Sequence, residues 1–97
     1  MPAPAGEPPS HPRIRYLERF LREYAKAPCA VQEAFDKQVT LLLENPRHPS
    51  LQSRKYESCE FVPVRQIWYA RATRAWRFYF TTVGDTYWFL SIRPHPK

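Results

Sequence analysis

The spacing of apolar residues changes once along this chain, and that change limits the possible folds more than any other feature. Between Arg13 and about Glu44, apolar side chains recur every three or four residues, which is the spacing of amphipathic helices. From about Gln66 to Arg93, residues alternate between two sets, and β-branched and aromatic side chains are frequent, as in strands. Helices followed by strands predict an α+β domain.

Prolines set the limits of the predicted helices. Pro28 ends a first helix that begins near Arg13, and it suits the first turn of a second helix, which ends at Asn45-Pro46. Because the link between the helices is short, we expect an antiparallel helical hairpin. The inward stripes are predicted to be Leu17, Phe20, Leu21 and Tyr24, then Val31, Ala34, Phe35, Val39, Leu42 and Leu43.

The remaining features suggest one soluble domain. Residues 1–12 contain five prolines and are predicted to form a flexible extended tail, and residues 13–97 leave room for a single domain. No apolar run approaches the roughly 18 residues of a membrane helix, so we expect a cytoplasmic protein without membrane contact. The two cysteines lie far apart without metal-binding spacing, so we expect reduced thiols, no metal and no cofactor.

Three strands are predicted, at about Gln66–Thr73, Trp76–Thr82 and Thr86–Arg93. Their connections are short enough for hairpins, so the sheet should be an antiparallel meander. A weak extended stretch at Leu51–Tyr56 could add one strand. The predicted fold is therefore a helical hairpin packed on one face of a twisted antiparallel sheet of three to four strands.

Alternation along these strands assigns their side chains to two faces. One face is wholly apolar and is expected to bury the helices: Trp68, Ala70, Ala72, Trp76, Phe78, Phe80, Trp88, Leu90 and Ile92. The other face is expected to hold Ile67, Tyr69, Arg71, Arg77, Tyr79, Thr81, Tyr87, Phe89, Ser91 and Arg93, with His95 if the strand continues. This second face has no acid among its strand residues, and it is the candidate site.

Charge is concentrated in the same part of the chain. Residues 65–97 contain six Lys or Arg against one Asp, whereas residues 1–64 contain nine against eight acids. Arginine interleaved with tyrosine suits RNA, because guanidinium groups bind phosphates while rings stack on bases. A docking face for an acidic peptide and a plain solvated surface are the alternatives.

Several runs of residues resemble the RelE/ParE superfamily of type II toxin–antitoxin toxins. The resemblance covers about residues 14–97 and includes LENPRHPSL at 43–51, WYARATRAWRFYF at 68–80, GDT at 84–86 and IRPH at 92–95. It implies a microbial-ribonuclease-like fold. For the RelE branch it implies a ribosome-dependent endoribonuclease that cleaves mRNA in the A site without a metal and so inhibits translation.

The resemblance also implies roles for particular residues. Arg77 would stabilise the transition state, Arg71 would serve phosphate or proton chemistry, and His95 would be a general acid or base. Arg54 and Lys55 would hold the RNA backbone. Further RNA contacts are predicted for Tyr69 and Tyr79, by stacking on bases, and for Arg93.

The resemblance implies partners and alternatives as well. The expected partners are a cognate antitoxin, the ribosome and mRNA. One alternative is a ParE-like inhibitor of DNA gyrase, and another is a catalytically decayed member that binds only an antitoxin or RNA. Many ribosome-dependent members continue into a segment with a catalytic tyrosine, whereas this sequence ends at Lys97, so slow or absent cleavage is expected unless another group replaces that tyrosine.

Overall fold

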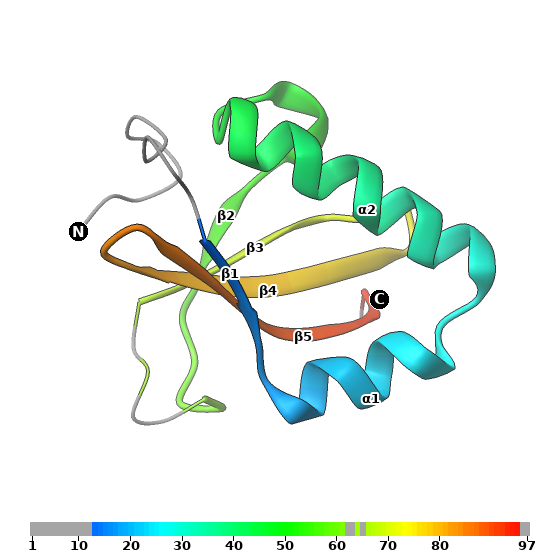
Figure 1. Ribbon diagram of the computed structural model, residues 1–97, viewed down its shortest axis with the longest axis horizontal. Helices are drawn as coiled ribbons and strands as arrows, with labels where there is room; N and C mark the ends of the chain where they lie inside the picture. The colour runs from blue at the N-terminus through cyan, green and yellow to red at the C-terminus, as the bar shows by residue number, and fades with distance from the viewer. Residues whose placement is uncertain (1–12, 62–63, 65, 96–97) are drawn as a thin grey trace.

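The structure is a computed structural model that describes residues 13–61, 64 and 66–95. The predicted proline-rich tail, 1–12, lies outside the described residues. The elements in chain order are β1 (Arg13–Tyr16), α1 (Glu18–Lys26), α2 (Cys29–Glu44), the short 3₁₀ helix η1 (Pro49–Leu51), β2 (Arg54–Tyr56), β3 (Ile67–Arg71), β4 (Trp76–Val83) and β5 (Thr86–Pro94). Figure 1 shows the two helices running in opposite directions beside the sheet.

The sheet has five strands in the order β1-β5-β4-β3-β2, rather than the three to four predicted. The three long strands form the predicted antiparallel meander, and β2 adds an antiparallel edge. The other edge, β1, pairs parallel with β5. The helical interpretation of Arg13–Tyr16 was therefore wrong, because this segment bonds to β5, with the Arg13 N–H donating to the Asp85 carbonyl (2.9 Å).

The α2 helix spans the predicted residues and packs on one face of the sheet. Val31, Phe35, Val39 and Leu42 of α2 join Phe20 of α1 in the main core, which includes Phe78, Phe80 and Phe89 of the sheet. The predicted stripe of α1 is only partly correct. Phe20 is buried, but Leu21 is 51% exposed, and Leu17 packs against a different cluster.

A β-bulge in β5 changes the face assignment of that strand. Tyr79 pairs with Ser91 and Phe80 pairs with Phe89, so Leu90 is an extra residue between two pairs. The predicted faces before the bulge are therefore reversed. Tyr87 and Phe89 lie in the main core on the helix side, whereas Trp88 and Leu90 lie on the other side; beyond the bulge, Ile92 is in the main core as predicted.

The second face of the sheet is not an open surface, as the alternation suggested, but holds a smaller core. Its buried members are Phe61, Ile67, Tyr79 and Leu90. Phe61 belongs to the connection between β2 and β3, which lies on the side of the sheet opposite α2 in Figure 1. The smaller core therefore leaves one part of this face for a binding site. That part is the end of the sheet where the C-terminal end of β5 lies beside β4 and β3.

Candidate anion-binding site at the C-terminal end of the sheet

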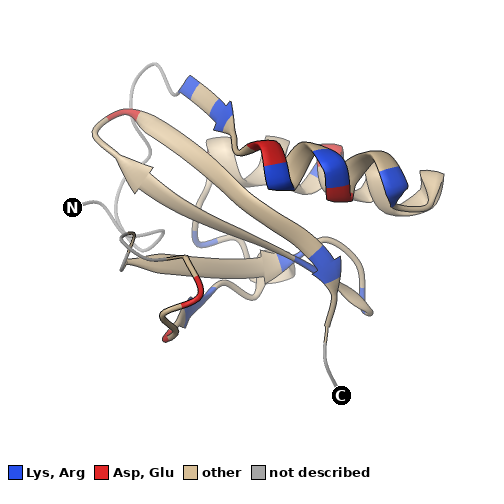
Figure 2. Ribbon diagram, turned by 90° about the horizontal axis from the view of Figure 1, so that it is seen from below, with Lys and Arg blue, Asp and Glu red and all other residues tan. Residues whose placement is uncertain are grey.

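Three arginines lie in one row across the sheet. Arg71 of β3 is the cross-strand partner of Arg77 of β4, and Arg77 is in turn the partner of Arg93 of β5. Residues that face each other across antiparallel strands project from the same face. Figure 2 shows basic positions coming together where these strands run side by side. The row confirms the prediction, made from the alternation of side chains along the strands, that the three arginines lie on one face.

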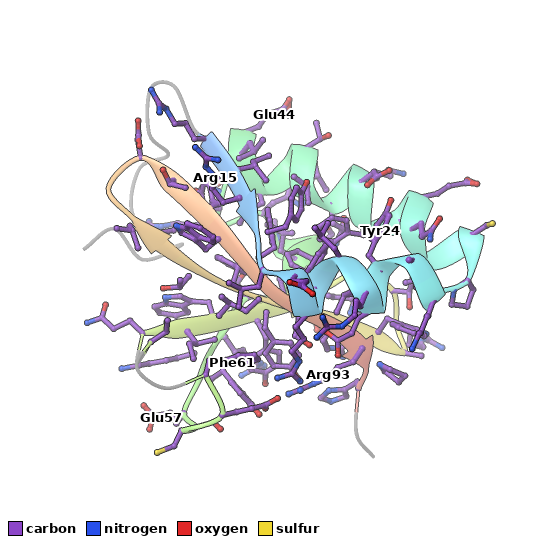
Figure 3. All side chains as sticks on the ribbon, turned by 60° about the horizontal axis from the view of Figure 1, so that its bottom comes forward. Arg15, Tyr24, Glu44, Glu57, Phe61 and Arg93 are labelled. Atoms are coloured by element: carbon purple, nitrogen blue, oxygen red, sulfur yellow. The ribbon has the colours of Figure 1, made fainter. Side chains whose placement is uncertain are left out.

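Arg93 is already engaged by a carboxylate. Its guanidinium makes a two-point contact with Glu60, with Arg93 Nη2 2.8 Å from Glu60 Oε1, and lies 4.4 Å above the ring of Tyr79. Figure 3 shows Arg93 on the same side of the sheet as Phe61, the neighbour of Glu60. The Arg93 hydrogen bonds lower the pKa of Glu60 to about 2, assisted by Tyr56 and Arg19, despite partial burial. The same carboxylate raises the pKa of Arg93.

Glu60 was missed because only strand residues were assigned to faces. It lies in the connection after β2, and its partner Arg93 is 33 positions away, so no spacing rule links them. Arg19 of α1 completes the cluster, with its Nη2 2.6 Å from Glu60 Oε2. The prediction that no strand residue of this face is an acid therefore holds, but an acid from outside the strands reaches the face at Arg93.

Arg71 and Arg77 differ from Arg93 because their hydrogen bonds go to neutral groups. Arg77 Nη1 donates to the carbonyls of Thr73 (3.0 Å), Arg74 (3.1 Å) and Trp76 (3.1 Å). Arg71 Nη2 donates to Gln52 Oε1 (2.8 Å), and its buried Nε has no hydrogen-bond partner among the described residues. Within the described part of the chain, no carboxylate lies within 4.0 Å of either guanidinium.

Partial burial and the nearby Arg71 charge lower the pKa of Arg77. Because arginine stays protonated at neutral pH all the same, the two guanidinium groups form a fixed pair of positive charges. This pair is the best candidate for binding an anion.

His95 directly follows β5 and lies near Tyr69 of β3. Its backbone N–H donates to the Ala75 carbonyl (2.6 Å), and its exposed ring lies nearly parallel to that of Tyr69, with centroids 6.5 Å apart. Tyr69 is only half-buried, so its ring has an accessible part. Tyr79 is 3% exposed and packs under Arg93, so its predicted stacking on a base is wrong.

Arg54 and Lys55, predicted as a basic pair, are on different faces. Arg54 is the cross-strand partner of Tyr69, and Lys55 is the partner of Trp68, whose side chain packs on the helix side. Arg54 therefore shares the face of the arginine row, whereas Lys55 does not. Lys55 also lies 3.6 Å from the Glu57 carboxylate.

Metal-ligating residues do not gather in the described part of the chain, where no group of three or more His, Cys, Asp or Glu side chains could hold an ion. The helices described also include none long and apolar enough to cross a membrane.

Comparison by sequence finds no matching family model and no matching curated protein. Solved structures do match. YafQ from Escherichia coli shares 15% identity over 88% of this chain and 94% of its own, with a TM-score of 0.69. RelE in the archaeal RelE–RelB complex from Pyrococcus horikoshii shares 15% over 86% and 93% (TM-score 0.67).

The intact E. coli RelBE toxin–antitoxin complex matches at 17% identity over 90% of this chain and all of the matched chain, with a TM-score of 0.63. These values describe a common fold that spans nearly the whole of each partner. They confirm the fold that the sequence resemblance implied. The chain therefore has the fold of the RelE/ParE superfamily of toxins from type II toxin–antitoxin systems.

Proposed function

We propose that this protein is the toxin of a type II toxin–antitoxin system and inhibits translation by cutting mRNA on the ribosome. The observation that carries the proposal is the cross-strand pair Arg71–Arg77, which has no carboxylate within reach among the described residues. The shared fold supports the toxin class, and the chemistry of this pair supports RNA as the target.

Stability alone does not account for this pair. Like charges placed directly opposite each other in an antiparallel sheet are destabilising, and Arg77 is partly desolvated as well. A phosphate bound between the two guanidinium groups would remove the repulsion and would accept charge-assisted hydrogen bonds from both. Arginine is suited to this role because its planar fork matches phosphate geometry.

In the reaction we propose, groups near this pair stabilise the charge and carry out one of the two proton transfers, and water exchanges the other proton. The 2′-hydroxyl of a nucleotide attacks the adjacent phosphorus and gives up its proton, the 5′-oxygen leaves and gains one, and the products are a 2′,3′-cyclic phosphate and a 5′-hydroxyl. Arg77, supported by Arg71, would stabilise the negative charge of the pentacoordinate phosphate. His95 would carry out one of the two proton transfers, and Tyr69 would stack on a neighbouring base.

An antitoxin is the expected protein partner. Two of the matched structures are complexes of a RelE toxin with RelB. In this chain the partner would cover Arg71 and Arg77 with acidic side chains, because these two cations of the row have no carboxylate partner among the described residues. Arg93, which Glu60 engages, would contribute less to that contact.

Controlled expression tests the proposal. Wild-type protein should stop growth and generate new mRNA 5′ ends in translated regions, and Arg77→Ala should abolish both. The matched control is Arg22→Ala, which removes the same charge from a surface ion pair with Glu18 on α1. Growth arrest with intact mRNA and lost DNA supercoiling would show a gyrase inhibitor instead. Harmless expression of folded protein would show a member that only binds.

A further inference from the structure

The turn between α2 and β2 lies between two surface hollows. The smaller, of about 250 Å³, is lined by Pro46, Arg47, His48, Pro49, Gln52, Ser53 and Trp68. The larger, of about 500 Å³, is lined by Ala34, Lys37, Gln38, Leu41, His48, Ser50, Arg71 and Ala72. His48 borders both, so it forms the partition between them. We call these two hollows, with His48, the η1 groove.

The η1 groove is basic throughout. Its lining includes Lys37, Arg47, His48 and Arg71, and none of the described residues that line it is an aspartate or glutamate. A concave surface lined by one sign of charge attracts ligands of the opposite sign.

A hydrogen bond from the backbone of Ser50 fixes which nitrogen of the His48 ring can donate. The Ser50 N–H donates to His48 Nδ1 (3.2 Å), and this bond requires Nδ1 to carry no proton. The neutral ring therefore carries its proton on Nε2, which remains available as a hydrogen-bond donor.

The scaffold around His48 is fixed by Gln38, which is 9% exposed and donates to the carbonyls of Ser50 (3.2 Å) and Arg71 (2.8 Å). It ties α2 to both the turn and β3.

Two polar side chains border the smaller hollow with their polar atoms turned away from it. Trp68 Nε1 and Ser53 Oγ are buried and have no hydrogen-bond partner among the described residues, and both residues line the smaller hollow. The basic side chains that line the groove suit a phosphate group.

We propose that the η1 groove binds a ribose-phosphate unit of the RNA strand next to the unit held by Arg71 and Arg77. Arg71 links the two sites, because it belongs to the arginine row and also borders the larger hollow. The groove therefore continues the path of the strand from the sheet toward α2. This inference rests on the proposed function, since it assigns the groove to the same substrate.

The test uses the purified protein and a fluorescein-labelled single-stranded RNA of about 12 nucleotides, with binding followed by anisotropy at several salt concentrations. The variant is Lys37→Ala combined with His48→Asn, because asparagine can still accept the Ser50 N–H at this cap position. Its control is Lys26→Ala, which removes an exposed charge at the end of α1.

We expect the double variant to bind RNA about tenfold more weakly and to reduce the salt dependence of log K by about 1, as loss of one to two phosphate contacts requires. Lys26→Ala should bind like wild type. If the double variant keeps wild-type affinity while Arg77→Ala weakens binding, the inference is overturned and the proposed function stands. If wild-type protein shows no RNA affinity, the proposed function fails first. If the double variant loses affinity for an aspartate-rich peptide but binds the RNA as wild type does, the inference is also overturned.

Discussion

Replacing Glu60 with glutamine removes one negative charge from the β2–β3 connection while keeping a side chain of nearly the same shape. In the folded protein that charge is shared by Arg93, Arg19 and the hydroxyl of Tyr56, which donates to Glu60 Oε1 (2.8 Å). Together these contacts tie the connection to β5 and α1. Glu60→Gln is therefore expected to destabilise the fold and to leave Arg93 without its carboxylate.

The size of the effect follows from the pKa of Glu60, which the Arg93 hydrogen bonds lower from 4.5 to about 2. At about 1.4 kcal/mol per pH unit, a fully retained effect would be about 3 kcal/mol. The side chain is 27% exposed, so solvent and salt screen the interaction, and we expect a loss of about 1–2 kcal/mol in the free energy of unfolding.

The pH dependence has a definite sign. Because the folded pKa lies below the unfolded one, the stabilisation is complete above the unfolded value of 4.5 and is lost as the pH falls toward 2. Urea denaturation of wild type and Glu60→Gln should show the largest difference near neutral pH and a shrinking one on acidification.

The control is Glu57→Gln, whose carboxylate is 78% exposed and 3.6 Å from Lys55; it should cost less than about 0.5 kcal/mol. Equal effects of the two substitutions, or a difference that grows in acid, would refute this account of Glu60.

Three further substitutions test the fold by urea denaturation. Gly84→Ala should cost roughly 1 kcal/mol because the backbone φ of 60° disfavours a side chain although the space around it is open, and a stabilised variant would contradict that strain. Leu42→Ala should cost about 2–4 kcal/mol at a fully buried site, far more than Leu21→Ala at a half-exposed one, and similar losses would misplace the core. Ser91→Ala should cost about 1–2 kcal/mol, because the buried Ser91 hydroxyl donates to Glu23 (2.6 Å), and a neutral result would show that this bond contributes nothing.

Local signals explain what the sequence could predict. The α2 helix lies between Pro28 and Asn45-Pro46, and proline acts on its immediate neighbours, so both ends were readable. The meander followed from its short connections for the same reason. By contrast, β1 is four residues long and forms only through a parallel pairing with β5, some 70 positions away, which no local pattern reveals.

The bulge in β5 shows a different limit. Residues 87–92 are apolar at almost every position, so shifting the alternation by one residue leaves both faces apolar. The extra residue of the bulge, Leu90, therefore leaves the apolar pattern of the sequence unchanged. The predicted row of arginines was nevertheless correct, because Arg71 and Arg77 precede the bulge in the chain and Arg93 follows it on the predicted face. The difference between Arg93 and the other two arginines could not be predicted, because only the fold brings Glu60 to Arg93.

The central claim is that Arg71 and Arg77 act on an RNA phosphate, and cleavage by purified components tests it most directly. Wild type and Arg77→Ala would be incubated with ribosomes carrying a short defined mRNA, and the fragments would be analysed by mass spectrometry. The account predicts fragments ending in a 2′,3′-cyclic phosphate only when ribosomes are present, formed at least about 100-fold more slowly by Arg77→Ala. Equal rates for the two proteins, or fragments ending in a 3′-hydroxyl, would contradict it.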